Sequence, residues 1–347
     1  MIFSKTLIRW YSNNKRNLPW RETKNPYYIW LSEIILQQTQ VKQGLPYYDA
    51  FVSNFPTVFD LANAYEEDVL KLWQGLGYYS RARNLHASAK YVATELKGIF
   101  PNNYKDLLKL KGVGDYTASA IASICFDEVA AVVDGNVYRV LSRYFGISTP
   151  INSTKGQKEF KALAQELIDK NNPADFNQGI MEFGATQCKP KNPECNICPF
   201  SNGCIAFNKN KINDLPVKIK SAKAKKKYFN FLVFISEDEH TILQKREGKG
   251  IWQNLYQFPL VETEMEVDSD SFKEHLKRHV LLREAQFELS LYNKDSIVHK
   301  LSHQHLYTKF WIVNLSKLPV SGISISEIRN FAVPILIGNF IESFNFE

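Results

Sequence analysis

The sequence has 347 residues, 44% of them hydrophobic, and a formal net charge of +7. That length suits two hydrophobic cores better than one. Charges interrupt every apolar run before the roughly 18 residues that a membrane helix needs, and the N-terminus lacks the pattern of a signal peptide. We therefore expect a cytoplasmic protein with no membrane partner. The excess of basic over acidic residues is a mild indication of a polyanionic partner.

Residues 1–210 read as a helical domain. The stretch NPYYIWLSEIILQQTQV begins with Asn25 as a helix cap and Pro26 at the first helical position. Other segments show apolar residues at three- and four-residue spacing and are separated by short breaks with Gly, Pro or Asn. These segments are residues 58–74, 80–96, 104–110, 116–126, 135–145 and 157–168.

Residues 211–227 form a lysine-rich segment, which we interpret as a solvated linker that can also lie along a phosphate backbone. The pattern then changes, and residues 228–347 read as a smaller α+β domain. In this domain we expect a hairpin formed by residues 228–237 and 240–246, a helix at 271–281 and a strand at 310–315.

Four of the five cysteines fall within seventeen residues, in CKPKNPECNICPFSNGC: Cys188, Cys195, Cys198 and Cys204. Four thiolates at this spacing can enclose one metal centre, and the chain leaves no ligand position open for a substrate. General ligand rules allow either zinc or an iron–sulfur cluster. The fifth cysteine, Cys125, lies in a small-residue helix and is expected to be a buried apolar side chain.

Residues 107–123, LLKLKGVGDYTASAIAS, have the form of a helix, a Gly-Val-Gly turn and a second helix. Gly112 and Gly114 permit a tight turn with exposed amide groups. The second helix adds its free N–H groups and the positive end of its dipole. Together these groups can bind one phosphate without reading base sequence.

Glu33 is an acid in an otherwise apolar helix, LSEIILQQT. Its neighbours at three- and four-residue offsets are Ile29, Leu36 and Gln37. Either Glu33 faces solvent on the helix flank, or an apolar environment raises its pKa for use as a general acid. Composition and spacing leave both readings open.

The motifs LKGVGDYTASA and VDGNVYRV and the four-cysteine run resemble the helix-hairpin-helix DNA glycosylase superfamily. LPWR, LSEIILQQTQV and GLGYYSRARNLH resemble its adenine-removing branch, and QKREGKGIWQNLYQFP and LSHQHL resemble the Nudix-like domain of that branch. The resemblance implies a multidomain α and α+β protein. By this resemblance we expect an all-helical helix-hairpin-helix domain (1–210, hairpin 104–123) with a 4Fe–4S cluster in the loop 188–204. A linker (211–227) and a Nudix-like α+β domain (228–347) that recognises the lesion are expected to follow.

The resemblance also implies an activity: hydrolysis of the N-glycosidic bond of adenine mispaired with 8-oxoguanine or guanine in duplex DNA, by a monomeric, nucleoid-associated enzyme. It assigns protonation of adenine N7 to Glu33 and stabilisation of the oxocarbenium-like sugar to Asp134, with support from Tyr116 and Asn136. From the sequence alone, Asp134 can equally be a helix cap. Tyr116 stands where the endonuclease III relatives carry a lysine, and a phenol cannot form an imine, so we expect no efficient lyase step.

The target base must leave the duplex. The resemblance places Arg21 and Trp20 at the adenine pocket and several residues on the DNA around the opposite base. These DNA-binding residues are Gly112, Gly114, Gln38, Thr39, Leu76, Tyr78, Ser302 and His303. Leu301 stands where the family has an aromatic residue, which lowers the expected stacking area on the lesion.

Several alternatives stay open. Leu76 and Tyr78 can be core residues, and the histidines at 299, 303 and 305 can bind a metal. The whole protein can instead be an endonuclease III-like glycosylase/lyase, or a non-catalytic DNA-binding protein with a zinc knot.

Overall fold

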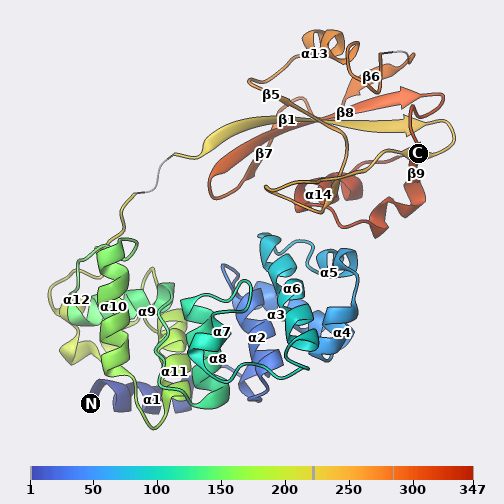
Figure 1. Ribbon diagram of the computed structural model, residues 1–347. Coiled ribbons are helices and arrows are strands. Elements are labelled where there is room, and N and C mark those ends of the chain that lie inside the picture. The colour runs from blue at the N-terminus through green and yellow to red at the C-terminus, as the bar shows by residue number, and fades with distance from the viewer. Residues whose placement is uncertain (1, 221–222, 284, 347) are drawn as a thin grey trace. The chain divides into compact units, whose positions relative to one another are not determined.

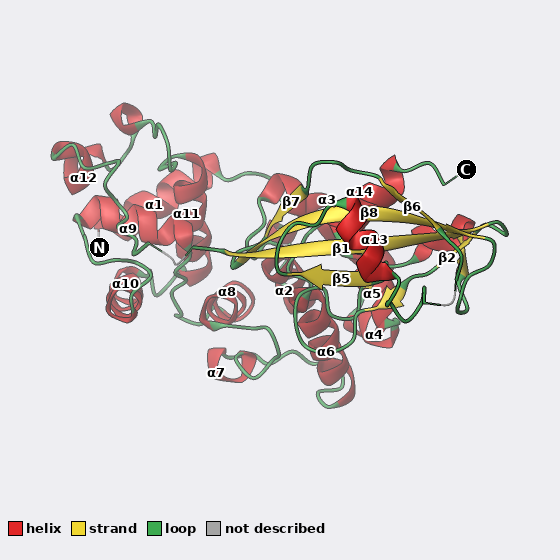
Figure 2. Ribbon diagram, turned by 90° about the horizontal axis from the view of Figure 1, so that it is seen from above, coloured by secondary structure: helices red, strands yellow, loops and turns green. Residues whose placement is uncertain are grey.

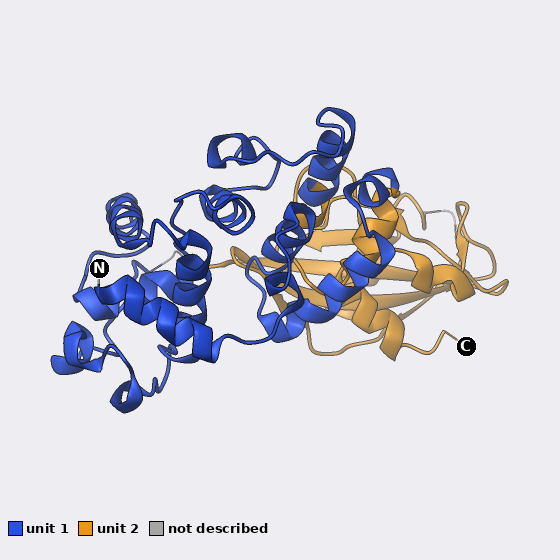
Figure 3. Cartoon of the chain, turned by 90° about the horizontal axis from the view of Figure 1, so that it is seen from below, with its two compact units in different colours: residues 1–63, 84–221 blue, residues 64–83, 222–347 orange. Residues whose placement is uncertain are grey.

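A computed structural model describes residues 2–220, 223–283 and 285–346. Residues 221 and 222, in the expected linker, lie outside the described residues. The chain divides into two compact units (Figure 3). Unit 1 is Met1–Asn63 with Asn84–Ser221, and unit 2 is Ala64–Arg83 with Ala222–Glu347. The segment Ala64–Arg83, which the sequence analysis placed in the helical domain, thus groups with the C-terminal part.

The described residues of unit 1 form helices joined by loops and contain no strand (Figure 1). Its α-helices are α1 (Ile2–Asn14), α2 (Pro26–Ile35), α3 (Val41–Asn54), α4 (Val58–Asn63), α6 (Ser80–Thr94, which begins in unit 2), α7 (Tyr104–Leu107), α8 (Asp115–Phe126), α9 (Gly135–Phe145), α10 (Thr154–Leu167), α11 (Pro173–Thr186) and α12 (Ile205–Asn208). No helix in the described ranges is long and apolar enough to cross a membrane.

Side-chain caps begin α2 and α9, two of the helices that carry the site. The Asn25 side chain accepts a hydrogen bond from the Tyr27 amide at 3.0 Å, and Pro26 opens α2, as the sequence predicts. Asp134 caps α9 in the same way. Helix α8 is rich in alanine, so it packs closely against α2 and α11. The start of α8 lies beside the C-terminal end of α2, where Tyr116 meets Glu33 and Thr117 meets Gln37.

Helices α7 and α8 form the predicted hairpin. Gly112 has φ +82°, in the left-handed region that favours glycine, and a Cβ atom there would lie 2.8 Å from the Asn84 Cβ atom. Gly114 has extended backbone and precedes the first residue of α8, with open space around the position of a Cβ atom. The turn thus needs glycine at 112 for conformation and clearance, and leaves the backbone at 114 exposed.

Unit 2 combines a sheet with a few helices. Its strands are β1 (Lys225–Ser236), β2 (His240–Thr241), β3 (Gln244–Lys245), β4 (Tyr256–Gln257), β5 (Leu260–Thr263), β6 (Glu288–Leu291), β7 (Ile297–Lys300), β8 (Gln304–Leu315) and β9 (Ile323–Ser324). Its α-helices are α5 (Glu66–Leu72), α13 (Ser269–Leu276) and α14 (Ile335–Ser343), and α6 begins here.

The main sheet has the order β5-β1-β8-β6, with β7 also paired to β8 (Figure 2). The two long strands β1 and β8 run parallel, and the other neighbours are antiparallel. The expected hairpin of residues 228–237 with 240–246 is wrong, because β1 pairs with β8 and β5, while β2 pairs with β9 and β3 with β4. The short connection between residues 237 and 240 suggested a hairpin. The longest strand pairing instead joins β1 to β8, which are far apart in the sequence.

Each face of the sheet is covered by a helix, α13 on one side and α14 on the other (Figure 1). Because neighbouring strand residues point to opposite faces, Trp311 packs on Phe272 of α13 at 4.5 Å between ring centroids, and Phe310 stacks on Phe340 of α14 at 4.1 Å. The sheet is therefore buried on both faces, which explains the nearly continuous apolar run of β1.

Candidate active site

Glu33 is a buried acid of α2, with 7% of its surface exposed. Burial raises the pKa of its carboxyl group from 4.5 to about 7. A hydrogen bond from Tyr116 and the charge of Arg21 lower it, and the charge of Asp134 raises it further. Near neutral pH a substantial fraction of Glu33 is therefore protonated, which is the form that a general acid needs.

Tyr116 is the second residue of α8, and this position brings its ring to Glu33. Its hydroxyl group hydrogen-bonds with the Glu33 carboxyl group and lies 3.1 Å from Met181 Sδ. Burial, followed by the charge of Glu33, raises the pKa of Tyr116 well above its usual value. The phenol therefore stays protonated and remains a hydrogen-bond donor.

Asp134 faces the same region from the N-terminus of α9. Its Oδ1 atom accepts hydrogen bonds from the Asn136 and Val137 amides, both at 2.8 Å, and its Oδ2 atom accepts one from Asn136 Nδ2 at 2.8 Å. Burial raises the pKa of Asp134, while these three hydrogen bonds oppose the rise. The carboxylate is thus rigidly capped and interacts electrostatically with Glu33.

Arg139 connects the Asp134 cap to the cysteine loop. Its Nη2 atom donates to Asn136 Oδ1 at 2.7 Å and to the Gly184 carbonyl at 2.6 Å, while Nε donates to the Cys188 carbonyl at 2.7 Å. With its Oδ1 atom held by Arg139, the Asn136 amide must turn its Nδ2 atom toward Asp134. Asn136 therefore supports Asp134 in one fixed orientation.

A buried ion group lies on the LPWR side of the site. The side chain of Glu182 on α11 is fully buried and accepts from Arg21 Nη2 at 2.7 Å and from Arg16 Nε at 2.7 Å. Burial alone would raise the pKa of Glu182, but the hydrogen bonds and charges of the two arginines lower it to about 2. Trp20 is buried beside them and packs its ring edge-on against Tyr48.

The QQT segment follows α2 directly. Gln37 donates to Thr117 on α8 at 3.1 Å, Gln38 has a left-handed backbone with φ 57°, and Thr39 Oγ1 donates to the Gln37 carbonyl at 3.3 Å. These contacts order the loop between α2 and α3 next to the hairpin that carries Tyr116. Glu33, Tyr116, Asp134, Asn136, Arg21 and this loop all belong to unit 1.

Four of the residues expected around the opposite base fall into unit 2, on two segments far apart in sequence. Leu76, Tyr78, Ser302 and His303 line one cavity of about 520 Å³. Tyr78 is 53% exposed and its hydroxyl lies 3.2 Å from Ser302 Oγ, whereas Leu76 is buried. Tyr78 thus offers its ring to a ligand, while Leu76 would have to move to reach a duplex.

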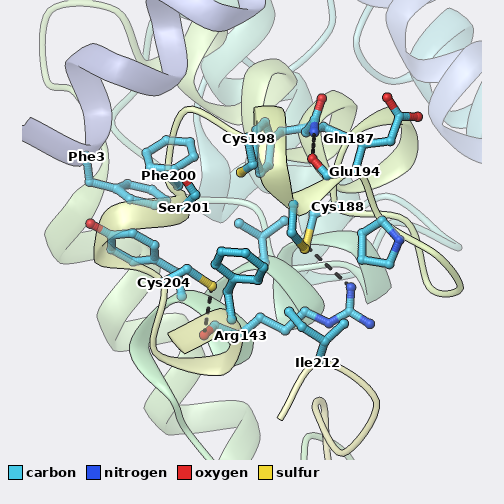
Figure 4. A pocket seen from close by; sticks show the side chains of 16 residues that line it. Phe3, Arg143, Gln187, Cys188, Glu194, Cys198, Phe200, Ser201, Cys204 and Ile212 are labelled. Carbon is cyan, nitrogen blue, oxygen red and sulfur yellow. Dashed lines mark hydrogen bonds between the residues drawn. The ribbon is translucent and has the colours of Figure 1, made fainter. Parts of the chain in front are cut away.

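The four clustered cysteines line a single cavity, to which α9 contributes Arg143 (Figure 4). Arg143 Nη1 lies 3.5 Å from Cys188 Sγ, and Cys204 Sγ lies 3.5 Å from the Arg143 carbonyl. All four cysteines are unpaired thiols. Within the part of the chain that the structure describes, no three Cys, His, Asp or Glu side chains gather around a single-ion site.

Comparison with known proteins shows the family of the chain. Residues 31–170 match the HhH-GPD superfamily of base excision DNA repair proteins, and residues 230–343 match the NUDIX domain family. The chain is 37% identical over 316 residues to the adenine DNA glycosylase of Buchnera aphidicola subsp. Schizaphis graminum, which covers 91% of this chain and 88% of that one. The chain belongs to the adenine DNA glycosylase family.

Further relatives agree with this assignment. The adenine DNA glycosylase of Homo sapiens is 46% identical over 213 residues, which is 59% of this chain and 39% of that one. The solved structure of a thermostable thymine-DNA glycosylase matches with a TM-score of 0.56 at 33% identity, over 60% of this chain and 96% of that chain. The expected fold class, a helix-hairpin-helix domain with a Nudix-like α+β domain, is confirmed.

Sequence reasoning missed two residues of this site, Arg16 and Glu182. Glu182 lies in GIMEFGAT, an acid among small and apolar residues, which is the same signal that drew attention to Glu33. Arg16 lies in a polar stretch, NNKRN, that carries no such signal. Only the packing of α11 against α1 brings the two side chains together.

Proposed function

We propose that this adenine DNA glycosylase acts on duplex DNA and removes adenine paired with 8-oxoguanine or guanine, by hydrolysis and without a lyase step. The supporting observation is the Glu33 carboxyl group, buried with a pKa of about 7 and hydrogen-bonded to Tyr116. Adenine is a poor leaving group as an anion. Protonation of N7 by Glu33 lets it leave as a neutral base.

Departure of adenine leaves positive charge on the sugar. The Asp134 carboxylate, held by three hydrogen bonds from the start of α9, supplies a fixed negative charge for that cation. Tyr116 orients Glu33, and Asn136 orients Asp134. Arg21 and Trp20 shape the adenine pocket, and Arg21 is itself held by Glu182.

The hairpin and the cavity of unit 2 bind the DNA around the flipped base. The 112–114 turn and the start of α8 offer backbone N–H groups to one phosphate. Gln38 and Thr39, together with Leu76 and Tyr78, contact the opposite base. Ser302 and His303 read the lesion edge. Because the substrate is duplex DNA, we place the enzyme in the cytoplasm, associated with the nucleoid. We propose that it acts as a monomer.

The four cysteines are proposed to hold a 4Fe–4S cluster. The cysteine set fits, because all four thiols line one cavity and Arg143 Nη1 lies 3.5 Å from Cys188 Sγ. Cys188, Cys195, Cys198 and Cys204 would hold the cluster, which would cross-link the loop 188–204. Arg139 and Arg143 then tie that loop to α9, the helix that Asp134 caps.

One assay tests the proposal. The full chain is incubated with a duplex that carries a single adenine opposite 8-oxoguanine and is then treated with hot alkali, which breaks the strand at an abasic site. We expect cleavage at that adenine, no cleavage with Glu33→Gln, and full cleavage with the exposed matched variant Glu95→Gln. Absence of cleavage by the unmodified chain would overturn the proposal.

The same assay separates the alternatives. Strand cleavage without alkali, together with trapping of the protein on DNA by borohydride, would favour the glycosylase/lyase. Binding of the duplex with no adenine released would favour the non-catalytic DNA-binding protein. The absence of a lysine at position 116 favours hydrolysis over the lyase reaction.

A further inference from the structure

A strained turn carries Tyr78. Gly75, Gly77 and Tyr78 have φ values of 100°, 71° and 48°, so three of the four residues in the 75–78 turn have a left-handed backbone. Glycine adopts this region freely, but a tyrosine does so at a cost. Such a conformation persists only where the surrounding structure holds it, and strained residues of this kind are frequent at functional sites.

The side chain of Arg81 fills the inside of this turn. Its Nη2 atom donates to the Leu76 carbonyl at 3.3 Å and to the Gly77 carbonyl at 3.2 Å. Its guanidinium carbon lies 5.0 Å from the centre of the Trp73 ring and 5.8 Å from that of the Tyr78 ring. Arg81 is buried, which lowers its pKa to about 10, so it stays charged at neutral pH.

The turn presents Tyr78 to the cavity of unit 2. The Tyr78 hydroxyl meets Ser302 Oγ at 3.2 Å, and both residues line the cavity of about 520 Å³. 8-Oxoguanine differs from guanine only along one edge, at O8 and N7–H. Discrimination along one edge depends on polar groups held at fixed positions, because a displaced hydroxyl group pairs with either base equally poorly.

We propose that Arg81 is a positioning residue that holds the 75–78 turn, sets the Tyr78 hydroxyl against Ser302, and thereby sets how strongly the enzyme prefers adenine opposite 8-oxoguanine to adenine opposite guanine. This inference rests on the proposed function. The role requires a guanidinium, whose planar faces can lie against aromatic rings while one terminal nitrogen donates to two carbonyl groups. The ammonium group of a lysine has no planar face and cannot lie against the two rings while it donates to the carbonyl groups.

The experiment measures the ratio of kcat/KM for two duplexes, one with adenine opposite 8-oxoguanine and one with adenine opposite guanine. Arg81→Met and Arg81→Lys in the full chain should each lower this preference about tenfold, the effect of one lost hydrogen bond to the lesion. Lys90→Met, on an exposed position of the same helix α6, should leave it unchanged. Ser302→Ala should lower the preference, and Arg81→Met in that background should lower it no further.

The results that overturn the inference are distinct. An equal fall in kcat/KM on both duplexes would mean that Arg81 only stabilises the fold. Additive effects of the Arg81 and Ser302 variants on the preference would mean that the two residues act separately. If Arg81→Met fails to fold, as judged by circular dichroism, Arg81→Lys carries the test. If the unmodified chain cleaves neither duplex, the proposed function fails, and the inference is then decided by the same ratio of binding affinities for the two intact duplexes.

Discussion

Asn136 Nδ2 lies 2.8 Å from Asp134 Oδ2, and the amide that carries it is held in place from behind by Arg139. Through Arg139, this contact links the cysteine loop to Asp134, the carboxylate that we propose stabilises the sugar cation. The amides of α9 hold the other oxygen atom of Asp134, so a helix cap at this position is compatible with the proposed catalytic role. The two readings that the sequence left open for Asp134 are physically compatible.

Asn136→Ala removes one of the three donors to Asp134. The carboxylate then loses a charge-assisted hydrogen bond, so its negative charge is less stable when the sugar cation forms. We expect the single-turnover rate of adenine release to fall about tenfold or more, with little change in affinity for the duplex. Ser153→Ala, which removes the cap of α10, is the matched control for lost stability. An unchanged rate in Asn136→Ala would show that Asp134 does not depend on this donor.

The pH dependence of the reaction follows from Glu33. Its pKa is raised to about 7, and the protonated form donates the proton. The single-turnover rate should therefore fall as the pH rises through about 7, tenfold per pH unit well above it. Rates measured from pH 5.5 to 9 on a duplex with adenine opposite 8-oxoguanine test this. A rate that stays level up to pH 9 would exclude Glu33 as the general acid.

The same raised pKa makes Glu33 destabilising as the pH rises. Between pH 4.5 and 7 the unfolded chain loses its Glu33 proton while the folded chain keeps it, so the free energy of unfolding declines with pH, by on the order of 3 kcal/mol. Glu33→Gln stays neutral in both states and should escape this decline. Urea unfolding at several pH values should show the stability advantage of the variant growing from pH 4.5 to 7. An advantage that is constant with pH contradicts the pKa assignment.

Glu182→Gln leaves two arginines without the carboxylate that they share. Because the Glu182 side chain is fully buried, we expect the free energy of unfolding near pH 7 to fall by about 3 kcal/mol. The pKa of Glu182 is lowered to about 2, so its contribution is present above pH 4.5 and is lost as the pH falls toward 2. The stabilities of the variant and the unmodified chain should therefore converge in acid. Equal stabilities at pH 7 would show that the ion group contributes nothing net.

Cys198→Ser removes one thiol of the four that line a single cavity. We expect the purified variant to lose the yellow-brown colour and the roughly four iron atoms per chain that a cubane cluster brings. Cys125→Ser is the matched control, because Cys125 lies on α8 outside this cavity and should leave the iron content intact. A colourless unmodified chain that contains one zinc would refute the iron–sulfur assignment.

The sequence predicted local features of the site well. The hairpin turn required Gly112, and the cysteine spacing matched one cavity, because both features depend on residues close together in the chain. It also predicted that Tyr116 and Glu33 belong together, but only through resemblance. Nothing in the residues around Glu33 could show whether its helix face is buried.

Local sequence patterns could not predict which strands pair when the strands are far apart in the sequence. The hairpin expected for residues 228–246 does not form, because β1 gains a longer ladder with β8, which starts at residue 304. Similarly, residues 64–83 have the helical pattern of unit 1 but belong to unit 2, where Tyr78 meets Ser302.

The amino-acid sequence by itself determined where helices α2 and α9 begin and which four cysteines line one cavity. It also determined that position 116 carries a phenol in place of an amine. These properties depend on hydrogen bonds and covalent chemistry within a few residues. Only the tertiary structure decided the proton affinity of Glu33, the arginines that hold Glu182, and the contact of Arg81 with the turn that carries Tyr78. The physical reason is that desolvation and charge interactions depend on what lies a few ångströms away in space, and packing brings those neighbours together from distant parts of the chain.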